Sequence, residues 1–321
     1  MSKNRLLLIV NPNSGTVAKS RILPTITSTL DNFQLPYDLV FTREAGHGRE
    51  LAHQAVLEGY RGVLACGGDG TVNEIGSALV GSDTAMGIVP CGSGNGLARH
   101  LGIPIDVEGS IRIIAEDNII NADYATGNDT PFFCTCGMGF DAAVSQRASG
   151  EKRRGLAMYI RNAASEFVNF TPDQYIIECD GEELTREAFI VAVCNASQYG
   201  NNAFIAPQAS ITDGLLDVMV VRSSNILEHA MVGVDMLTGM IGNNTLVDSF
   251  RTTHLKITRK ESGPVHFDGD SCQMPEVVDI TCHPGALKLF ASRRDVSFRP
   301  LVTPLQMLVR DVGLEIKHLF E

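Results

Sequence analysis

The chain has 321 residues, of which 44% are hydrophobic and 20% are charged, a composition typical of a folded globular protein with room for two domains. The 26 basic and 37 acidic residues give a formal net charge of -11, which argues against nucleic acid as a partner. The eight cysteines form no Cys-x-x-Cys pair and are expected to be reduced. No apolar run has the length of a signal-peptide core or a membrane span, so we expect a cytoplasmic protein that touches the inner membrane face only peripherally.

The first part of the chain alternates short apolar runs with helical stretches, which predicts an α/β domain with a parallel sheet covered by helices on both faces. The expected strands are 5–10, 37–41, 62–66 and 85–89. The expected helices are 17–31, 47–59, 71–80, 94–101 and 107–116. Ligands of such sheets bind at the carboxyl ends of the strands, and polar or glycine-rich segments follow all four expected strands.

The second part is rich in short β-type runs, which predicts a mostly antiparallel sandwich. The expected strands are 131–136, 174–179, 188–195, 215–221, 253–257, 277–281 and 287–290. Turns are expected at Asp180-Gly181, Asp213-Gly214 and Pro284-Gly285. The predicted organisation is an α/β domain over 1–125, a β-sandwich domain over 126–295 and a C-terminal helical segment over 296–321.

Two apolar stripes at helical spacing stand apart from the strands. One follows Asn225, a predicted N-cap, and we interpret it as a core-facing helix, with lipid binding as the alternative. The other lies within 303–320 and predicts a helix that packs back on the body. The stripes consist of Ile226, Ala230, Met231, Val234, Leu237 and Ile241, and of Leu305, Leu308, Val312, Ile316 and Leu319.

A glycine turn with one carboxylate, Gly67-Gly-Asp-Gly-Thr-Val-Asn-Glu74, directly follows the apolar run 62–66. Glycines let backbone N–H groups approach a phosphate closely, and the positive end of a following helix favours an anion. Asp69 can hold Mg²⁺ directly or through water. The alternative is an ordinary turn between a strand and a helix.

Two further loops support a nucleotide site. Asn11-Pro-Asn-Ser-Gly15 follows the first expected strand, and Gly92-Ser-Gly-Asn-Gly96 follows the fourth. Three glycine-containing loops on one sheet edge indicate a phosphate-binding crevice better than any one of them. No Walker A loop occurs, and Gly137-Met-Gly-Phe-Asp-Ala142 matches a dinucleotide pattern outside the parallel half, where that pattern has little meaning.

Two pairs of carboxylates stand in the β-rich half: Asp213 with Asp217, and Asp268 with Asp270. Each Asp-Gly dipeptide has the alternative interpretation of a plain hairpin turn. Phosphoryl transfer, however, needs carboxylates for Mg²⁺ and a base near the acceptor hydroxyl. Histidines form no cluster with metal spacing, and a Ser-His-Asp triad lacks support.

Together these motifs resemble the diacylglycerol kinase and sphingosine kinase family of lipid kinases in its bacterial form. The resemblance extends from about residue 4 to 292 and rests on the loops above, on Pro207-x-Ala209 with Asp213-Gly214, and on Asp268-Gly-Asp270. It implies a phosphofructokinase-like ATP domain, a β-sandwich domain, and a lipid site in a cleft between them. The implied activity is transfer of the ATP γ-phosphate to a primary hydroxyl of a lipid.

The resemblance also implies roles for individual residues. Asp69 would join the Mg²⁺ and phosphate network, Asp268 and Asp270 would be catalytic, and a further metal site would use Ser210, Asp213 and Leu215. The implied ATP contacts are Asn11, Pro12, Asn13, Ser14, Gly15, Thr42, Gly67, Gly68, Asp69, Gly70, Thr71, Val72, Asn73 and Ser93. This chain has Asp270 where the family usually has Glu, which leaves open whether Asp268 or Asp270 is the base.

Several alternatives stay open at this point. A kinase for NAD or a sugar also uses a Gly-Gly-Asp-Gly loop, and a regulator without catalysis is the reading from another class. Diacylglycerol, a sphingoid base, ceramide and phosphatidylglycerol all offer the required hydroxyl. The expected partners are a lipid substrate and, transiently, a membrane surface, and a homodimer is compatible with uncovered strand edges.

Overall fold

The computed structural model describes residues 4–14, 19–149, 156–167, 170–293 and 298–320. The chain divides into two compact units. The first unit contains Met1–Asp123 and Gly285–Val296, and the second contains Tyr124–Pro284 and Ser297–Glu321. Two of the three points where the chain passes from one unit to the other lie within strands, β5 (Ile119–Gly127) and β15 (Val277–Phe290).

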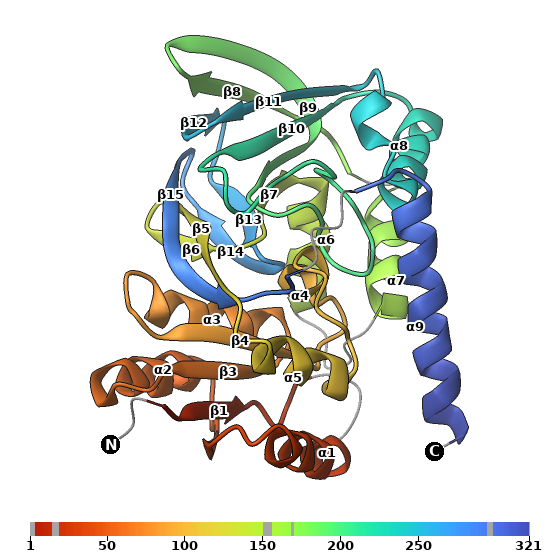
Figure 1. The fold of residues 1–321 in the computed structure, drawn as a ribbon. Helices are drawn as coiled ribbons and strands as arrows, with labels where there is room; N and C mark the ends of the chain where they lie inside the picture. Colours follow the sequence, from red (N-terminus) through yellow and green to blue (C-terminus); the bar gives the residue numbers. More distant parts are fainter. Residues whose placement is uncertain (1–3, 15–18, 150–155, 168–169, 294–297, 321) are drawn as a thin grey trace. The chain divides into compact units, whose positions relative to one another are not determined.

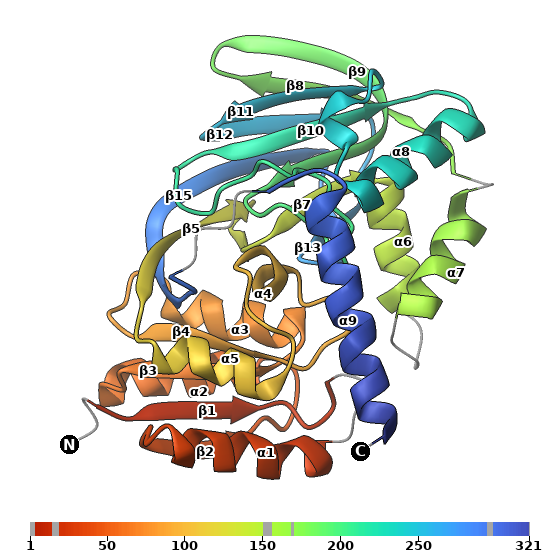
Figure 2. The same ribbon diagram turned by 45° about the vertical axis from the view of Figure 1, so that its right-hand side comes forward.

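The first unit is a parallel sheet in the order β2, β1, β3, β4, with helices on both faces (Figures 1 and 2). Apolar residues of α1 and α5 form one core cluster with side chains of the strands, and α2 and α3 lie on the other face. The strands are β1 (Leu6–Val10), β2 (Tyr37–Phe41), β3 (Gly62–Gly67) and β4 (Ala85–Pro90). The helices are α1 (Lys19–Asn32), α2 (His47–Glu58), α3 (Asp69–Leu79), α4 (Gly96–His100) and α5 (Val107–Ala115).

The second unit is built from antiparallel strands around an apolar cluster, and a second cluster lies between the sheet and the helices. Its strands are β6 (Thr130–Phe132), β7 (Thr135–Gly139), β8 (Asp173–Cys179), β9 (Glu182–Cys194), β10 (Leu216–Arg222), β11 (Val247–Thr252), β12 (His254–Arg259), β13 (Gly263–Phe267) and β14 (Asp270–Met274). Its helices are α6 (Phe140–Ser149), α7 (Leu156–Phe167), α8 (Ile226–Thr238), the short 3-10 helix Ile241–Asn243 and α9 (Val302–Phe320).

The predicted fold class is confirmed: an α/β part with parallel strands, a β-rich part and a C-terminal helix. The sequence patterns did not predict β5, α6, β11, β13 or β14. They were wrong about Pro284-Gly285, where β15 continues as one strand. Gly285 adopts a φ of 61° inside that strand, a left-handed conformation that glycine tolerates without steric cost.

The apolar stripe of α8 is not core-facing, contrary to our interpretation of the sequence. Met231 is 51% exposed and Leu237 is 59% exposed, whereas Val232 and His229 are buried on the opposite side. The His229 ring stacks on Phe189 with centroids 4.0 Å apart. The helix thus packs through the side that carries His229 and Val232, and the side that carries Met231 and Leu237 is exposed.

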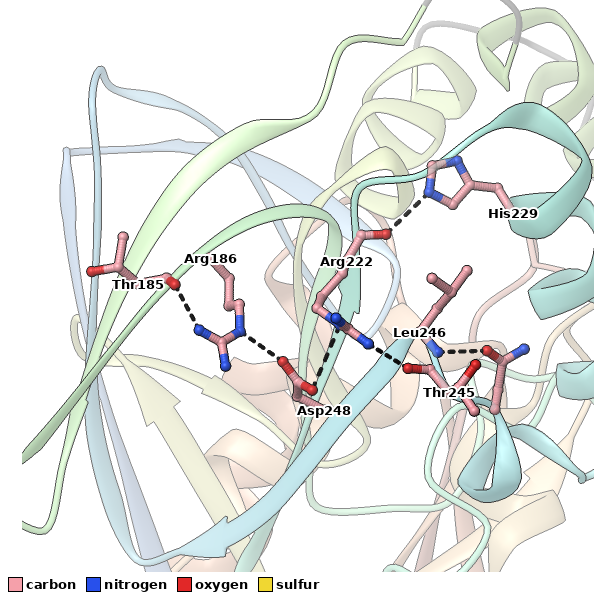
Figure 3. A network of polar contacts seen from close by, with 8 residues as sticks. Thr185, Arg186, Arg222, His229, Thr245, Leu246 and Asp248 are labelled. Carbon is pink, nitrogen blue, oxygen red and sulfur yellow. Dashed lines mark hydrogen bonds and ion pairs between the residues drawn. The ribbon is translucent and has the colours of Figure 1, made fainter.

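Polar contacts fix the buried side of α8 (Figure 3). His229 Nε2 lies 3.1 Å from the carbonyl oxygen of Arg222 at the end of β10. The carboxylate of Asp248 lies between Arg186 and Arg222, at 2.8 Å and 3.7 Å respectively, which connects β9, β10 and β11. His229 therefore ties α8 to the end of β10, and the side chain of Arg222 at that end pairs with Asp248.

The C-terminal helix α9 contacts the rest of the second unit through its first turns. Pro304 is buried, and Asn202 Nδ2 donates to Asp311 at 3.3 Å. The predicted stripe makes little of this contact, because Leu305 and Leu308 are 59% and 55% exposed. Among the described residues, no helix is both long and apolar enough to cross a bilayer.

Candidate active site

Four strand ends of the first unit bring the predicted nucleotide residues together. The backbone N–H of Asn11, after β1, donates to the carbonyl of Cys66 in β3 at 3.0 Å. The Asn11 amide then donates to the Thr71 hydroxyl at 3.0 Å, and the backbone N–H of Thr42, after β2, donates to the carbonyl of Val10 at 2.9 Å. Side chains from separate loops are thus already ordered by one another.

Asp69 joins the two main glycine loops. Its Oδ2 accepts the backbone N–H of Asn95 at 2.9 Å, and its Oδ1 accepts that of Gly96 at 2.7 Å. The loops touch so closely that a Cβ on Gly92 would lie 2.5 Å from the Cα of Gly68. Only glycine fits there, which explains the paired glycines physically.

The loop before α4 is closed by its own asparagine. Asn95 adopts a φ of 51°, and its side chain both accepts from the N–H of Gly92 at 2.9 Å and donates to the carbonyl of Gly92 at 2.8 Å. Ser93, the predicted ATP contact in this loop, is exposed. The predicted contact Gly15 lies outside the described residues, whereas Ser14 is buried and its hydroxyl donates to the Asn11 carbonyl at 3.0 Å.

Glu74 is a site residue that the sequence analysis quoted without assigning a role. Its carboxylate accepts the backbone N–H of Gly46 at 2.8 Å and that of Gly48 at 3.1 Å, at the start of α2. It therefore ties the loop after β2, which carries Thr42, to the helix that follows Asp69. The signal was its position as the last residue of the Gly67–Glu74 motif.

In the second unit, Asp268 and Gly269 form the tight turn between β13 and β14, with φ values of 51° and 89°. The hairpin alternative for this dipeptide is thus confirmed, and it carries an unusual addition. The Asp268 carboxylate accepts three backbone N–H groups, of Phe133 at 2.9 Å, Cys134 at 2.7 Å and Thr135 at 3.1 Å. Asp268 is an anchor that fixes the turn against the segment before β7.

Asp270 follows this turn as the first residue of β14 and is exposed. It pairs in register with Phe267, which is buried. Successive residues of a strand point to opposite faces, so the hairpin pairing fixes the backbone position of Asp270. The two catalytic candidates therefore differ: Asp268 is engaged by backbone amides, and Asp270 is presented on the surface of its unit.

At the predicted metal position, Asp213 pairs with the side chain of Arg251. Asp213 Oδ1 accepts the backbone N–H of Leu215 at 3.2 Å, and its Oδ2 forms a close ion pair with Arg251. Arg251 also lies 3.5 Å from Asp217, with which it is in register between β11 and β10. Burial raises the pKa of Asp217, and the nearby Arg251 opposes that rise.

The guanidinium of Arg251 already pairs with one oxygen of the Asp213 carboxylate, so a divalent metal at this position would compete with that cation. The described residues include no group of three or more His, Cys, Asp or Glu side chains placed to hold a metal. At Asp69 the arrangement is compatible with Mg²⁺, because carboxylate oxygens that accept one backbone N–H can also accept a metal-bound water.

Comparison with known proteins gives matches over both units. Residues 5–126 match the family profile described as the diacylglycerol kinase catalytic domain. Residues 134–291 match the profile described as the YegS C-terminal NAD kinase beta sandwich-like domain.

Two curated relatives match most of the chain. A protein of Chromohalobacter salexigens named "Probable lipid kinase YegS-like" is 31% identical over 256 residues, which are 78% of this chain and 82% of that protein. The diacylglycerol kinase of Bacillus subtilis is 26% identical over 275 residues, with 83% and 89% covered.

Solved structures share the fold. A crystal structure of a diacylglycerol kinase from Bacillus anthracis strain Sterne superposes with a TM-score of 0.70 at 21% identity, covering 90% of this chain and 97% of that one. Another structure from the same strain gives a TM-score of 0.76 at 23% identity, with 90% and 98% covered.

Proposed function

The chain belongs to the bacterial lipid kinase family that joins a diacylglycerol kinase catalytic domain to a YegS-type C-terminal domain, and from this premise we propose that it transfers the γ-phosphate of ATP to a primary hydroxyl of a lipid. The observation that carries the proposal is the bond of Asp69 to the backbone of Asn95 and Gly96. It gathers two glycine loops at the strand ends, where a backbone without side chains lets a polyphosphate approach closely.

ATP would lie along the loops that follow β1, β3 and β4, and the hydrogen-bonded pair Asn11 and Thr71 would help to orient it. Mg²⁺, held through Asp69 and water, would supply charge compensation for the phosphates. Rigid placement of both reactants is the main contribution that a protein makes to phosphoryl transfer. The interlocked loops support this role because their side chains are paired before the nucleotide arrives.

We assign the proton-accepting role to Asp270 and the anchoring role to Asp268. A base must reach the acceptor hydroxyl at about 2.6–3.2 Å, which favours an exposed carboxylate. The Asp268 carboxylate instead holds three amides of the neighbouring segment. Aspartate at 270 is one C–C bond shorter than the glutamate usual in the family, so the acceptor would lie correspondingly closer to the β14 backbone.

Phosphorylation of a lipid panel in mixed micelles tests the proposal. Wild type and Asp270→Asn would be incubated with labelled ATP and Mg²⁺, with diacylglycerol, a sphingoid base, ceramide and phosphatidylglycerol as acceptors. Label on one lipid class that disappears in the variant supports the kinase and identifies its acceptor. Absence of label on every lipid, with intact ATP binding, contradicts it.

NAD is the acceptor of the second candidate function. The C-terminal profile is described as NAD kinase beta sandwich-like, and such kinases also use a Gly-Gly-Asp-Gly loop. NAD and fructose 6-phosphate therefore belong in the same assay. Label on NAD alone would make the chain a nucleotide kinase. ATP binding without label on any acceptor would favour the regulator.

A lipid acceptor also requires access to a bilayer, and we propose that α8 provides it. Its exposed side consists of Ile226, Leu227, Met231, Val234 and Leu237. The helix contains no Lys or Arg, its Glu228 accepts a hydrogen bond from Ser224, and its Asp235 accepts one from Asn244 at 2.6 Å. An aliphatic surface with locally bonded acids suits insertion among acyl chains, independent of lipid charge.

A further inference from the structure

A largely buried polar network adjoins the Asp268-Gly269 turn. Asp141 in the first turn of α6 is 6% exposed, and its Oδ2 accepts the Tyr199 hydroxyl at 2.8 Å. The same oxygen lies 3.1 Å from Nε2 of His266, a residue of β13 that is 2% exposed. Polar side chains this deep in a unit are costly unless they are hydrogen-bonded to one another, as these are.

The network ends on the backbone of the turn. His266 Nδ1 lies 3.4 Å from the backbone N–H of Gly269, which donates to it. A ring nitrogen that accepts carries no proton, so Nε2 carries the ring proton and donates to Asp141. The order of donors is therefore fixed: Gly269 donates to His266, and His266 and Tyr199 donate to Asp141.

A glycine leaves room for this contact. Gly137 on β7 pairs in register with His266, and a Cβ on Gly137 would lie 2.1 Å from Asp141 Oδ2 and 2.2 Å from His266 Nε2. Gly139, two residues on, has a φ of 96° and leads directly into α6. The Gly-x-Gly-x-Asp sequence that imitates a dinucleotide motif thus serves to place Asp141 against His266.

We propose that Asp141, His266 and Tyr199 are positioning residues that orient the Asp268–Asp270 turn for phosphoryl transfer. The inference rests on the proposed function and extends it to two buried side chains and the half-buried Tyr199, none of which is assigned a contact with the substrate. Asp268 holds one side of the turn through the segment before β7, and His266 holds the glycine from within the unit. The two attachments together fix the direction in which Asp270 leaves the turn.

Two substitutions of His266 distinguish a role in positioning the turn from a role that only provides a hydrogen-bond partner for the buried Asp141. In His266→Asn the amide oxygen takes the place of Nδ1 and can accept from Gly269, while the contact with Asp141 is lost. In His266→Gln the longer amide reaches toward Asp141, while the acceptor for Gly269 is lost. The pair therefore cuts the network on opposite sides of the ring.

If His266 positions the turn, the Gln variant loses about 100-fold in kcat with little change in KM for ATP, because small misplacements of reacting groups have effects of that size. The Asn variant keeps more kcat than the Gln variant even though it melts at a lower temperature. If His266 only satisfies Asp141, the order of kcat reverses, which overturns the proposal. Tyr199→Phe removes the outer donor and is expected to fall between the two.

Hydrogen exchange supplies a readout that does not need activity. Peptides covering 266–271 are expected to exchange faster in the Gln variant than in the wild type, while peptides of the β8–β9 turn at Asp180-Gly181 are unchanged. Unchanged exchange at 266–271 in the Gln variant contradicts the proposal. A wild type that phosphorylates no acceptor would instead contradict the proposed function, and the exchange comparison would still decide the role of His266.

Discussion

The carboxylate of Asp69 and the backbone N–H of Gly96 are joined at 2.7 Å, which ties the loop after β3 to the loop after β4. In Asp69→Asn one carboxylate oxygen becomes an NH₂ group that faces a backbone donor. We expect a stability loss of about 1–3 kcal/mol and loss of the thermal stabilisation by Mg·ATP, since the phosphate-binding backbone would shift.

Differential scanning fluorimetry with and without Mg·ATP measures both effects. Asp83→Asn is the matched control, because Asp83 lies in the same unit with a fully exposed side chain that pairs only at the surface with Lys288. An Asp69→Asn protein stabilised by Mg·ATP as strongly as the control would remove Asp69 from the nucleotide site.

Asp268 and Asp270 are expected to respond differently to the same substitution. Asp270→Asn should reduce kcat by about 10²–10⁴ without lowering the melting temperature, as expected of a general base. Asp268→Asn should lower both kcat and the melting temperature, because one carboxylate oxygen is lost as an acceptor for backbone amides. Asp270→Glu, which restores the residue usual in the family, should retain turnover.

The chain offers a matched control for these variants. Asp180-Gly181 forms the same kind of turn between β8 and β9, with φ values of 51° and 81°. Asp180→Asn should leave kcat unchanged. Full turnover in Asp270→Asn together with loss in Asp268→Asn at unchanged stability would reverse the two assignments.

Arg251 is expected to make the Asp213 turn independent of divalent metal. In Arg251→Gln the carboxylates of Asp213 and Asp217 lose their cation, and repulsion between them favours binding of Mg²⁺ or Mn²⁺. Without nucleotide, millimolar Mg²⁺ should raise the melting temperature of the variant more than that of the wild type. Removal of Asp213 as well should abolish the difference. An equal response of wild type and variant would refute this expectation.

The first unit could be predicted closely because β1, β3 and β4 are nearly continuous apolar runs that end in glycine or proline or are soon followed by proline. The glycine loops identify the sheet edge, but their mutual bonding through Asp69 is a tertiary contact. The strands β13 and β14 were missed because both are only five residues long and carry polar residues. Their turn was nevertheless visible in the sequence as Asp268-Gly269.

The other features that the sequence did not predict depend on contacts between segments far apart in the chain. An apolar stripe on α8 predicts a face but not which side meets the core, and there the polar His229 packs on Phe189. The ion pair of Asp213 with Arg251 could not be predicted for a similar reason: Arg251 is 38 residues away in the sequence and is brought near by the pairing of β10 with β11.

Acid sensitivity of the first unit is expected from His100, at the end of α4. Burial lowers the pKa of His100 to about 4 from 6.5. The unfolded chain therefore binds a proton at this residue that the folded chain refuses between about pH 6.5 and pH 4, so stability falls as pH falls through that window. Because His100 is only half-buried, solvent makes its contribution smaller than the roughly 3 kcal/mol that the shift would otherwise give.

Urea unfolding at pH 7 and pH 4.5 measures this contribution. His100→Gln should lose less stability than the wild type between the two pH values, whereas the exposed control His53→Gln should follow the wild type. Equal losses in all three proteins would show that His100 does not contribute.

Vesicle binding is expected to depend on the exposed side of α8. Leu227 is 73% exposed and Met231 is 51% exposed, so replacing both with Ser should not disturb the core. Each aliphatic side chain that enters the acyl region contributes about 1.5–3 kcal/mol, so the double variant should bind at least about tenfold more weakly to phosphatidylcholine vesicles containing diacylglycerol. Because α8 has no Lys or Arg, binding should change little with salt or with added anionic lipid.

Leu57→Ser serves as the control, since Leu57 is 70% exposed on α2 of the first unit. Sedimentation with vesicles at low and high salt measures binding, and sedimentation velocity without vesicles measures self-association. Undiminished vesicle binding by the double variant contradicts the role of α8. A wild-type dimer that dissociates in the double variant would instead assign this aliphatic surface to a second copy of the chain.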